Sequence, residues 1–232
     1  MDFFDAVKRR RSIRKFIPGH PVPDEVIEKA LDAAIWAPNS SNAQTWDFYW
    51  VREPQKKQRL VLACLNQVAA RTASELVVVT VNPKKWRRSY PLLNEWVERE
   101  NAPKIVRTYY KRLIPHVYRW GFLNSFGLVK WIAMFFTGLF TPIIRTQNFR
   151  GQIQEVAVKS AALASENFVL AVAAQDYDTC MMEGFDQTRV RKILGLGWQD
   201  RVVMVIAVGK ANGKGTWNNP FRIPKELVIH TV

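Results

Sequence analysis

The chain has 232 residues and a mass of 26.8 kDa, which suits one domain with a substantial core. A hydrophobic fraction of 48% and a charged fraction of 23% exclude wholesale disorder, while two cysteines and three histidines exclude a disulfide framework and disfavour a zinc enzyme. The formal net charge of +14 favours anionic partners: nucleic acid, acidic lipid or phosphorylated small molecules. Because the N-terminal residues lack the apolar core of a signal peptide, we expect a cytoplasmic protein with reduced thiols.

The first 81 residues predict helices and strands separated by clear turns. A short helix is expected over residues 3–7 behind an Asp2 cap, and a basic run with six cations follows over 8–15. A proline-rich turn leads to a helix that begins at Asp24 and keeps its apolar residues on one face. Residues 37–42 have the composition of a loop, and strands are predicted over 48–51 and 76–81.

The last third of the chain predicts a second group of elements. A long helix is expected over 152–174, where small residues favour close packing in a core or against another subunit. A short strand over 179–182, a helix over 187–194 capped by Asp186 and an apolar strand over 202–208 follow. The tail from residue 212 has no room for another unit, and no repeat or linker divides the chain. We therefore expect a single α+β domain over residues 1–232.

Residues 120–144 form an aromatic segment whose one charge is Lys130. The uncharged run over 131–144 is shorter than the roughly 20 residues of a membrane span, and a longer span would place Lys130 near the middle of the membrane. A buried pair of helices, lining an apolar pocket or filling a dimer interface, is the preferred interpretation. Peripheral membrane contact through 120–144 is the alternative, because Arg119, Lys130 and Arg145 flank the aromatic side chains.

The signatures of several common enzyme classes are absent. The sequence contains no GxGxxG, GxxxxGK[ST] or GxSxG motif, so a Rossmann enzyme, a P-loop NTPase and an α/β-hydrolase lack their markers. The basic run by itself has three interpretations: a nucleic-acid patch, a solvated helix end, or a small-molecule site. In the last of these, Arg10, Ser12 and Arg14 would hold a phosphate and an anionic ring edge, since arginine forks and a hydroxyl donor suit a phosphomonoester.

Two motifs stand on either side of the helix that begins at Asp24. The first is R-x-S-x-R over residues 10–14, and the second is A-P-N-S-S-N-A-Q-T-W over residues 37–46. Taken together, they resemble the nitroreductase family of FMN-dependent oxidoreductases. Residues 162–186 resemble the family's long core helix, the short strand after it and its E-G-F-D turn. Residues 202–209 resemble its last core strand and 221–224 its basic tail. The resemblance covers residues 1–80 and 150–224 and leaves 82–149 unassigned.

The resemblance implies a nitroreductase-like α+β fold: a central, mostly antiparallel sheet flanked by helices, in a homodimer that exchanges C-terminal arms and binds FMN at its interface. It implies that Arg10, Ser12 and Arg222 bind the FMN phosphate with help from Arg11, and that Arg14 approaches the N1–C2=O edge and stabilises the anionic reduced flavin. The backbone at Glu183-Gly184 would face flavin N5, where hydride arrives and leaves. Further cofactor contacts are implied for Asn66, Met182 and, from the partner subunit, Pro38, Asn39, Ser40 and Asn42. No metal is expected.

The function implied is an FMN-dependent NAD(P)H oxidoreductase that passes hydride through flavin N5 to flat, electron-poor acceptors, either nitroaromatics or quinones. Residues 82–149 fall where the family has variable helices that cap the pocket, so we expect an aromatic-rich cap and a hydrophobic or aromatic acceptor. The sequence departs from the family pattern at Asn39, at Thr45 and at Met181-Met182, where the family commonly has Ser, Pro and a Pro-containing pair. These changes affect affinity and substrate shape more than the identity of the cofactor.

Three competing hypotheses remain. The same flavin fold could carry out reductive dehalogenation or other flavin chemistry. The chain could bind flavin without turnover, or it could be a basic protein of the membrane surface. We expect no specific nucleic-acid partner, because the phosphate already accounts for the cation cluster.

Overall fold

The computed structural model describes residues 1–232, with a four-stranded sheet at its centre. The strand order is β1 (Trp46–Trp50), β2 (Glu75–Val81), β4 (Arg201–Gly209), β3 (Asp178–Met182), and every neighbouring pair is antiparallel. The strands predicted over 76–81, 179–182 and 202–208 are therefore confirmed, while the strand predicted over 48–51 begins earlier, at Trp46. The α+β class with a flanked antiparallel sheet is confirmed.

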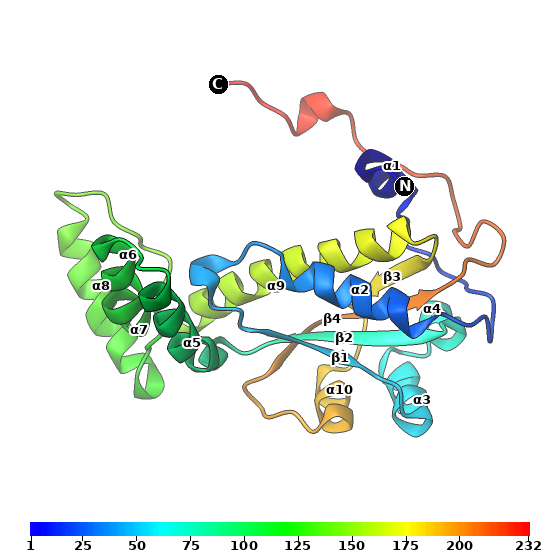
Figure 1. The fold of residues 1–232 in the computed structure, drawn as a ribbon, viewed down its shortest axis with the longest axis horizontal. Coiled ribbons are helices and arrows are strands. Elements are labelled where there is room, and N and C mark those ends of the chain that lie inside the picture. The colour runs from blue at the N-terminus through cyan, green and yellow to red at the C-terminus, as the bar shows by residue number, and fades with distance from the viewer.

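Strand β2 shows why the central strands are continuously apolar. Successive residues of a strand point to opposite faces. Val77 and Val79 pack in the layer formed by α2 (Asp24–Ile35) and α9 (Arg150–Ala174). Leu76 and Val78 pack in the opposite layer, which contains α3 (Pro54–Ala63), α4 (Val68–Thr72) and α10 (Gln187–Leu194). Figure 1 shows these two layers of helices on the two sides of the sheet.

Helix α9 is the principal core helix and begins at Arg150, slightly before the predicted start. Ala157, Ala161 and Ala164 are buried in the layer that α9 shares with α2, where small side chains allow a short distance between helix axes. The helix is also long and apolar enough to cross a membrane. Because half of its most apolar part is buried against the rest of the chain, α9 is the core helix of a folded domain.

The centre of this helix offers a test of the core. Phe168 is fully buried, and Phe168→Ala is expected to lower the free energy of unfolding by about 3–5 kcal/mol because a cavity remains. Urea denaturation followed by circular dichroism measures the change. Lys159→Ala, at an exposed position of the same helix, is the control and should change stability by about 0.5 kcal/mol or less. Equal losses for the two variants would contradict the core assignment.

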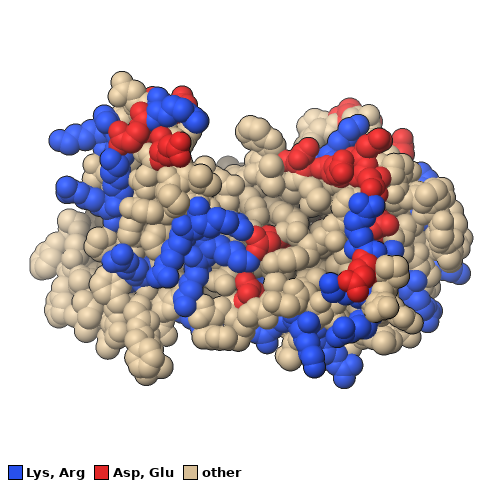
Figure 2. All heavy atoms as spheres, turned by 60° about the horizontal axis from the view of Figure 1, so that its bottom comes forward, with Lys and Arg blue, Asp and Glu red and all other residues tan.

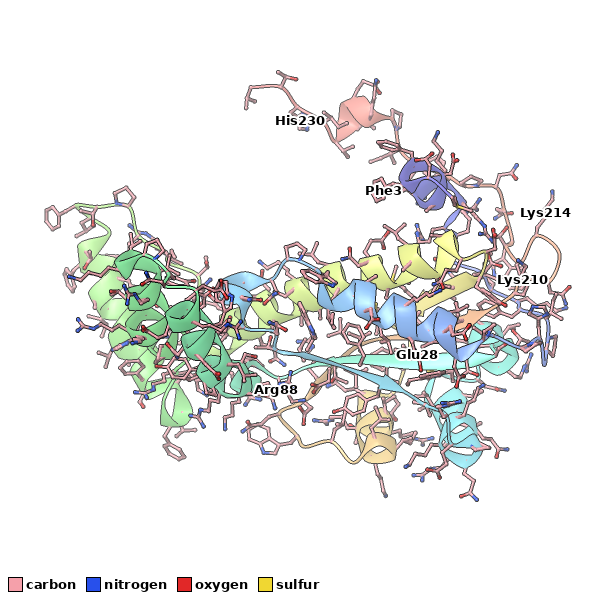
Figure 3. All side chains as sticks on the ribbon, viewed as in Figure 1. Phe3, Glu28, Arg88, Lys210, Lys214 and His230 are labelled. Atoms are coloured by element: carbon pink, nitrogen blue, oxygen red, sulfur yellow. The ribbon has the colours of Figure 1, made fainter.

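Both ends of the chain lie outside the core (Figure 1). Helix α1 (Phe3–Arg9) is capped as predicted, because the Asp2 carboxylate accepts a hydrogen bond from Phe4 N at 2.9 Å. Residues 217–232, the C-terminal arm, contain only the short helix η5 (Lys225–Leu227), and every one of them is exposed. Figure 3 labels Lys210 and Lys214, where the chain turns away from β4, and His230 near the end of the arm. Its first residues lie beside the basic segment, where Asn218 O accepts from Arg11 Nη2 at 3.2 Å, but no residue of the arm is buried within one chain.

Residues 83–137 form a helical lobe at the end of the molecule remote from α1 (Figure 1). Its small core contains Trp86, Ile114 and Tyr118. Its elements are η2 (Pro83–Lys85), α5 (Trp86–Arg99), α6 (Lys104–Thr108), the π-helical turn η3 (Tyr109–Leu113), α7 (Ile114–Val117), η4 (Phe122–Asn124) and α8 (Ser125–Thr137).

The expectation of a buried pair of helices over 120–144 is wrong for a single chain. Only Gly127 and Lys130 of α8 are buried, and most of its large apolar side chains are exposed. The physical reason is that Trp86, Ile114 and Tyr118, from other parts of the lobe, already fill its core.

Candidate functional site

The basic segment over residues 10–16 runs along the edge of strand β3. Ser12 forms a parallel bridge with Thr179, and Ile13 N donates to Thr179 O at 2.9 Å. Ile13 and Phe16 are buried in the core layer of α3, α4 and α10. These apolar anchors fix the backbone, so that the neighbouring arginines are held at the surface in defined positions.

Side chains from both ends of the chain line one cavity beside this segment. The cavity has a volume of about 270 Å³, and no carboxylate lines it. Its lining includes four arginines and one serine, namely Arg10, Arg11, Arg14, Arg222 and Ser12. Residues 216–221 complete the lining. The structure thus brings together the residues that the sequence assigned to a phosphate and to an anionic ring edge.

These arginines have few counter-charges. Arg10 Nε lies 3.8 Å from Oε1 of the partly exposed Glu166. Arg11 Nη2 donates to Asn218 O at 3.2 Å, and Arg14 Nη1 donates to Cys180 Sγ at 3.5 Å. Guanidinium groups with such weak partners keep donors available for the oxygen atoms of an anion. The donor set and the size of the cavity fit a phosphomonoester.

The loop over residues 37–44 borders a second cavity, of about 530 Å³, which includes Pro38, Asn39 and Asn42 in its lining. Ser41, Asn42 and Gln44 have positive φ values of 59°, 49° and 45°, a costly conformation that clusters at functional sites. Amide contacts hold this backbone: Asn39 Oδ1 accepts from Gln44 N at 2.9 Å, and Gln44 Nε2 donates to Asn42 Oδ1 at 3.1 Å. Ser40 N donates to Ser160 Oγ of α9 at 3.4 Å, which ties the loop to the core.

Two turns beside the end of β3 form a third group. Gln67 Nε2 donates to Gly184 O at 2.6 Å, and Asp186 N donates to Ala63 O at 2.8 Å. Asn66, with a φ of 53°, and Glu183 are both exposed here. Met182, which the resemblance assigns to the cofactor, is buried in the core.

The first and third groups lie along the same strand. Ser12 pairs with Thr179, and Glu183 follows four residues later, a separation of roughly 13 Å at 3.3–3.4 Å per residue. An elongated ligand with its phosphate among the arginines can extend toward the Glu183-Gly184 turn. Pro38, Asn39 and Asn42 line a separate cavity that shares no residue with the arginine cavity.

Sequence reasoning missed several residues that shape this site. Gln67 holds Gly184, and Trp217 lines the arginine cavity, yet neither belongs to a motif. The glycines Gly213 and Gly215 were a signal in the sequence for a tight turn next to this site, and both have positive φ. Gly215 O accepts from Arg14 N at 2.6 Å, and a Cβ at this glycine would lie 2.8 Å from Ile13 Cγ2. Only glycine permits this close turn beside the basic segment.

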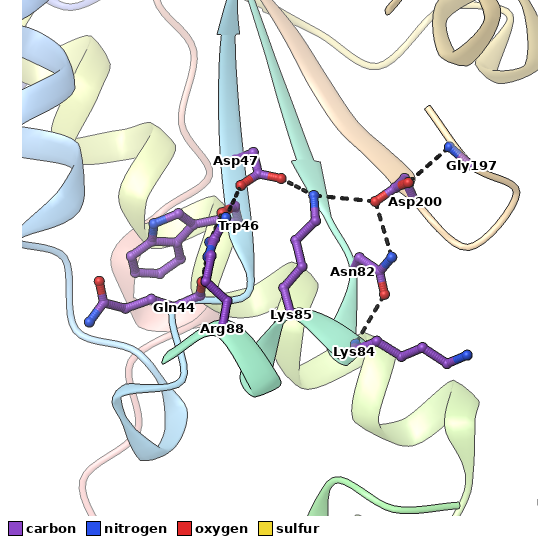
Figure 4. A network of polar contacts seen from close by, with 9 residues as sticks. All are labelled: Gln44, Trp46, Asp47, Asn82, Lys84, Lys85, Arg88, Gly197 and Asp200. Atoms are coloured by element: carbon purple, nitrogen blue, oxygen red, sulfur yellow. Dashed lines mark hydrogen bonds and ion pairs between the residues drawn. The ribbon is translucent and has the colours of Figure 1, made fainter. Parts of the chain in front are cut away.

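A polar network joins the loop over residues 37–44 and strand β1 to the start of the helical lobe (Figure 4). Lys85 Nζ contacts Asp47 and lies 3.3 Å from Asp200 Oδ1. Arg88 donates to Asp47 Oδ1 at 2.6 Å and to the carbonyl oxygen atoms of Gln44 and Trp46 at 3.0 and 3.1 Å. The start of the helical lobe and the loop over residues 37–44 are therefore held in one arrangement.

The buried thiols near the site give a pH-dependent prediction. Burial raises the pKa of Cys64 from 9.0 to about 12. The folded state thus keeps a proton that the unfolded state loses, so this contribution to stability is complete below pH 9 and falls by about 1.4 kcal/mol per pH unit as pH rises toward 12. Cys64→Ala should flatten the loss of stability above pH 9, measured by urea denaturation across this range. An unchanged slope in the variant would contradict the assignment.

Comparison with known proteins agrees with this arrangement. The Nitroreductase family matches residues 7–210. "Protein DrgA" of Synechocystis is 33% identical over 229 residues, covering 97% of this chain and 93% of that protein. "Putative NAD(P)H nitroreductase YdgI" of Bacillus subtilis is 27% identical over 229 residues, covering 98% and 96% of the two chains. A solved structure from Exiguobacterium sibiricum, in complex with FMN, superposes with a TM-score of 0.74 at 23% identity and covers 100% of this chain and 98% of that chain.

The matched range includes the basic segment, the loop over 37–44 and the Glu183-Gly184 turn. The likeness to the solved structure extends over the whole chain and shows the same fold. The predicted family, fold class and oxidoreductase class are confirmed: this chain belongs to the nitroreductase family.

Proposed function

We propose that the chain is an FMN-dependent NAD(P)H oxidoreductase that reduces flat, electron-poor acceptors. The observation that carries the proposal is the cavity in which Arg10, Arg14 and Arg222 converge without a carboxylate. Bound FMN would supply the redox chemistry by accepting hydride from NAD(P)H and passing it to the acceptor. The relative named as an NAD(P)H nitroreductase and the neighbour crystallised with FMN support this assignment.

Different residues around the cavity bind different parts of the cofactor. Arg10, Ser12 and Arg222 bind the phosphate, and Arg11 adds positive charge beside it. Arg14, whose only side-chain partner is the weak acceptor Cys180 Sγ, would be free to interact with the N1–C2=O edge of the ring. The backbone at Glu183-Gly184 would face N5, and Gln67 positions that turn through its hydrogen bond to Gly184 O. Asn66 and Met182 would be the neighbours of the ring.

A second copy of the chain completes this site. Pro38, Asn39, Ser40 and Asn42 would contact the cofactor bound to the partner. In one chain Pro38, Asn39 and Asn42 line a cavity separate from the arginine cavity, which supports this assignment. The exposed C-terminal arm packs on the partner in exchange. The functional unit is therefore a homodimer, and its cytoplasmic location remains a prediction.

The helical lobe, with the rest of residues 82–149, caps the site and shapes it for a hydrophobic or aromatic acceptor. It belongs to the single domain over 1–232, and direct contacts join it to the loop over residues 37–44. Ser41 Oγ lies 2.7 Å from Tyr109 Oη, and Tyr118 Oη donates to Ser40 O at 3.3 Å. Nitroaromatics and quinones are the acceptor classes that match such a cap, because they are planar and take electrons readily.

An acceptor series tests the proposal. The FMN-loaded protein is supplied with NADH or NADPH and with a soluble nitroaromatic, a short-chain benzoquinone and a long-chain benzoquinone. We expect reduction of both classes and a lower KM for the long-chain quinone, because apolar contacts strengthen its binding. FMN binding without NAD(P)H oxidation would contradict the proposed oxidoreductase activity. Equal KM values for the two quinones would contradict the proposed preference for a hydrophobic acceptor.

A further inference from the structure

Helix α8 and the residues on either side of it expose a large apolar surface. Phe122 and Leu123 are each 84% exposed, and Phe140 is 86% exposed. We call the following exposed side chains the aromatic face: Phe122, Leu123, Leu128, Val129, Trp131, Ile132, Phe135, Phe136, Leu139, Phe140 and Ile144. In Figure 2 the end of the molecule that the lobe occupies carries a broad surface without charged side chains. A soluble monomer rarely exposes an apolar surface of this kind unless another apolar phase covers it.

The one charge within this segment is turned away from the aromatic face. Lys130 is buried, and its Nζ donates to the carbonyl oxygen atoms of His116, Val117 and Gln147 at 3.3, 3.1 and 3.1 Å. Burial lowers the pKa of this lysine, while the three carbonyls solvate its ammonium group. The aromatic face can therefore enter an apolar phase without carrying the Lys130 charge into it.

The part of the chain that carries the aromatic face is rich in cations and contains no carboxylates. Residues 101–154 contain eight lysines and arginines and no aspartate or glutamate. Of these cations, Arg107 and Lys111 pair with an acidic side chain, which is Glu98 of α5 in both cases. The stretch is thus complementary to an anionic surface.

Two cavities near α8 are lined by cations of this stretch, and one of them also by Lys84 and Arg87. One, of about 670 Å³, includes Phe122 and Leu123 in its lining together with four cations, Lys84, Arg87, Arg119 and Arg150. The other, of about 940 Å³, is lined by Lys104, Arg112 and His116 among others, and the His116 ring lies 6.5 Å from the Phe126 ring of α8. No carboxylate lines either cavity.

We propose that the aromatic face docks on an anionic lipid bilayer. The aromatic side chains enter the acyl region, and the cations of the two cavities meet lipid phosphates. The apolar helical stretch Phe122–Thr137 is too short to span, since its 16 residues reach about 24 Å and the hydrocarbon core is about 30 Å thick. Docking is independent of the proposed oxidoreductase activity, and it would hold the enzyme where lipophilic acceptors concentrate.

Vesicle co-sedimentation of the flavin-loaded protein tests the proposal. We expect binding to phosphatidylcholine vesicles that contain phosphatidylglycerol, weaker binding at high salt, and little binding to phosphatidylcholine alone. Phe136→Asp/Phe140→Asp should reduce the partition coefficient by about tenfold or more, because two apolar contacts become charges at the bilayer. Arg87→Glu/Arg119→Glu should reduce both the binding and its dependence on salt.

Matched controls change the same kinds of residue elsewhere. Leu62→Asp replaces an exposed apolar residue of α3, and Arg59→Glu/Lys192→Glu makes the same change of net charge on α3 and α10. Both should bind vesicles as the unaltered protein does, and circular dichroism verifies the fold of every variant. The proposal is overturned if the unaltered protein does not sediment with anionic vesicles, or if the Phe136/Phe140 variant binds as Leu62→Asp does. It is also overturned if light scattering shows that this variant only breaks up a larger oligomer.

Discussion

Arg10→Ala/Arg222→Ala is expected to weaken FMN binding by about 10²–10⁴-fold and to leave riboflavin binding nearly unchanged. The two side chains come from opposite ends of the sequence and line the same cavity. A charge-assisted hydrogen bond contributes about 1.5–3 kcal/mol, so losing one from each arginine accounts for this range. Riboflavin lacks the phosphate, and its affinity therefore reports damage to the rest of the site. Quenching of flavin fluorescence on titration measures both affinities.

The control for this variant removes two other cations. Arg59→Ala/Lys192→Ala lowers the net charge equally, at exposed positions of α3 and α10, and should keep its FMN affinity. Equal losses of FMN and riboflavin affinity in the Arg10/Arg222 variant would show a general disruption rather than a lost phosphate contact. An equally large loss in the control would show that only the overall charge matters.

Ending the chain after Ile223 is expected to raise the dissociation constant of the dimer by at least about a thousandfold. The truncation keeps Arg222 and removes Leu227, Val228 and Ile229, all of which are exposed in one chain. If these side chains are buried on the partner, each contributes about 1.5–3 kcal/mol, and both arms are lost at once. Ordering of the arm offsets part of this gain, which is why the expected change is smaller than the full sum.

Analytical ultracentrifugation over a range of concentrations measures the dimer affinity. Because the arm contacts little within its own chain, the truncated protein should keep the circular dichroism spectrum of the full chain. Lys225→Ala, within the removed segment, is the control and should leave the dimer intact. A truncated chain that dimerises with unchanged affinity would contradict the exchange of arms.

Elements with local signals at both ends could be predicted from the sequence. Helix α10 has the limits predicted from its Asp186 cap. In the structure Asp186 Oδ1 accepts from the N–H groups of Thr188 and Arg189, and Gly195 ends the helix with a φ of 67°. Strands β2 and β4 were predicted from apolar runs that the structure buries on both faces. In each case the sequence near the element is sufficient to define it.

The exposure of helix α8 could not be predicted from the sequence near it. An apolar composition predicts a helix that avoids water, but it does not distinguish a buried core helix from one whose apolar surface another phase covers. That difference depends on Trp86, Ile114 and Tyr118, which fill the lobe from other parts of the chain. The inward direction of Lys130 depends on backbone carbonyls at residues 116, 117 and 147, which no local pattern specifies.

Some residues of the candidate site could be predicted from the sequence, and others could not. Arg10, Ser12 and Arg14 follow from a motif, and Arg222 from the resemblance of the tail. The contact of Gln67 with Gly184 depends on how the turn after α3 packs against the turn after β3. Such a contact between two turns leaves no spacing in the sequence, so only the folded chain reveals it.

The absorption spectrum of the purified protein tests the central claim most directly. The protein should show flavin bands, release FMN on denaturation, and lose its visible absorption when NADH or NADPH is added without oxygen. That result would establish a flavin reduced by a nicotinamide donor, and it would follow from the arginine cavity described here. A colourless protein that takes up no added FMN would contradict the account.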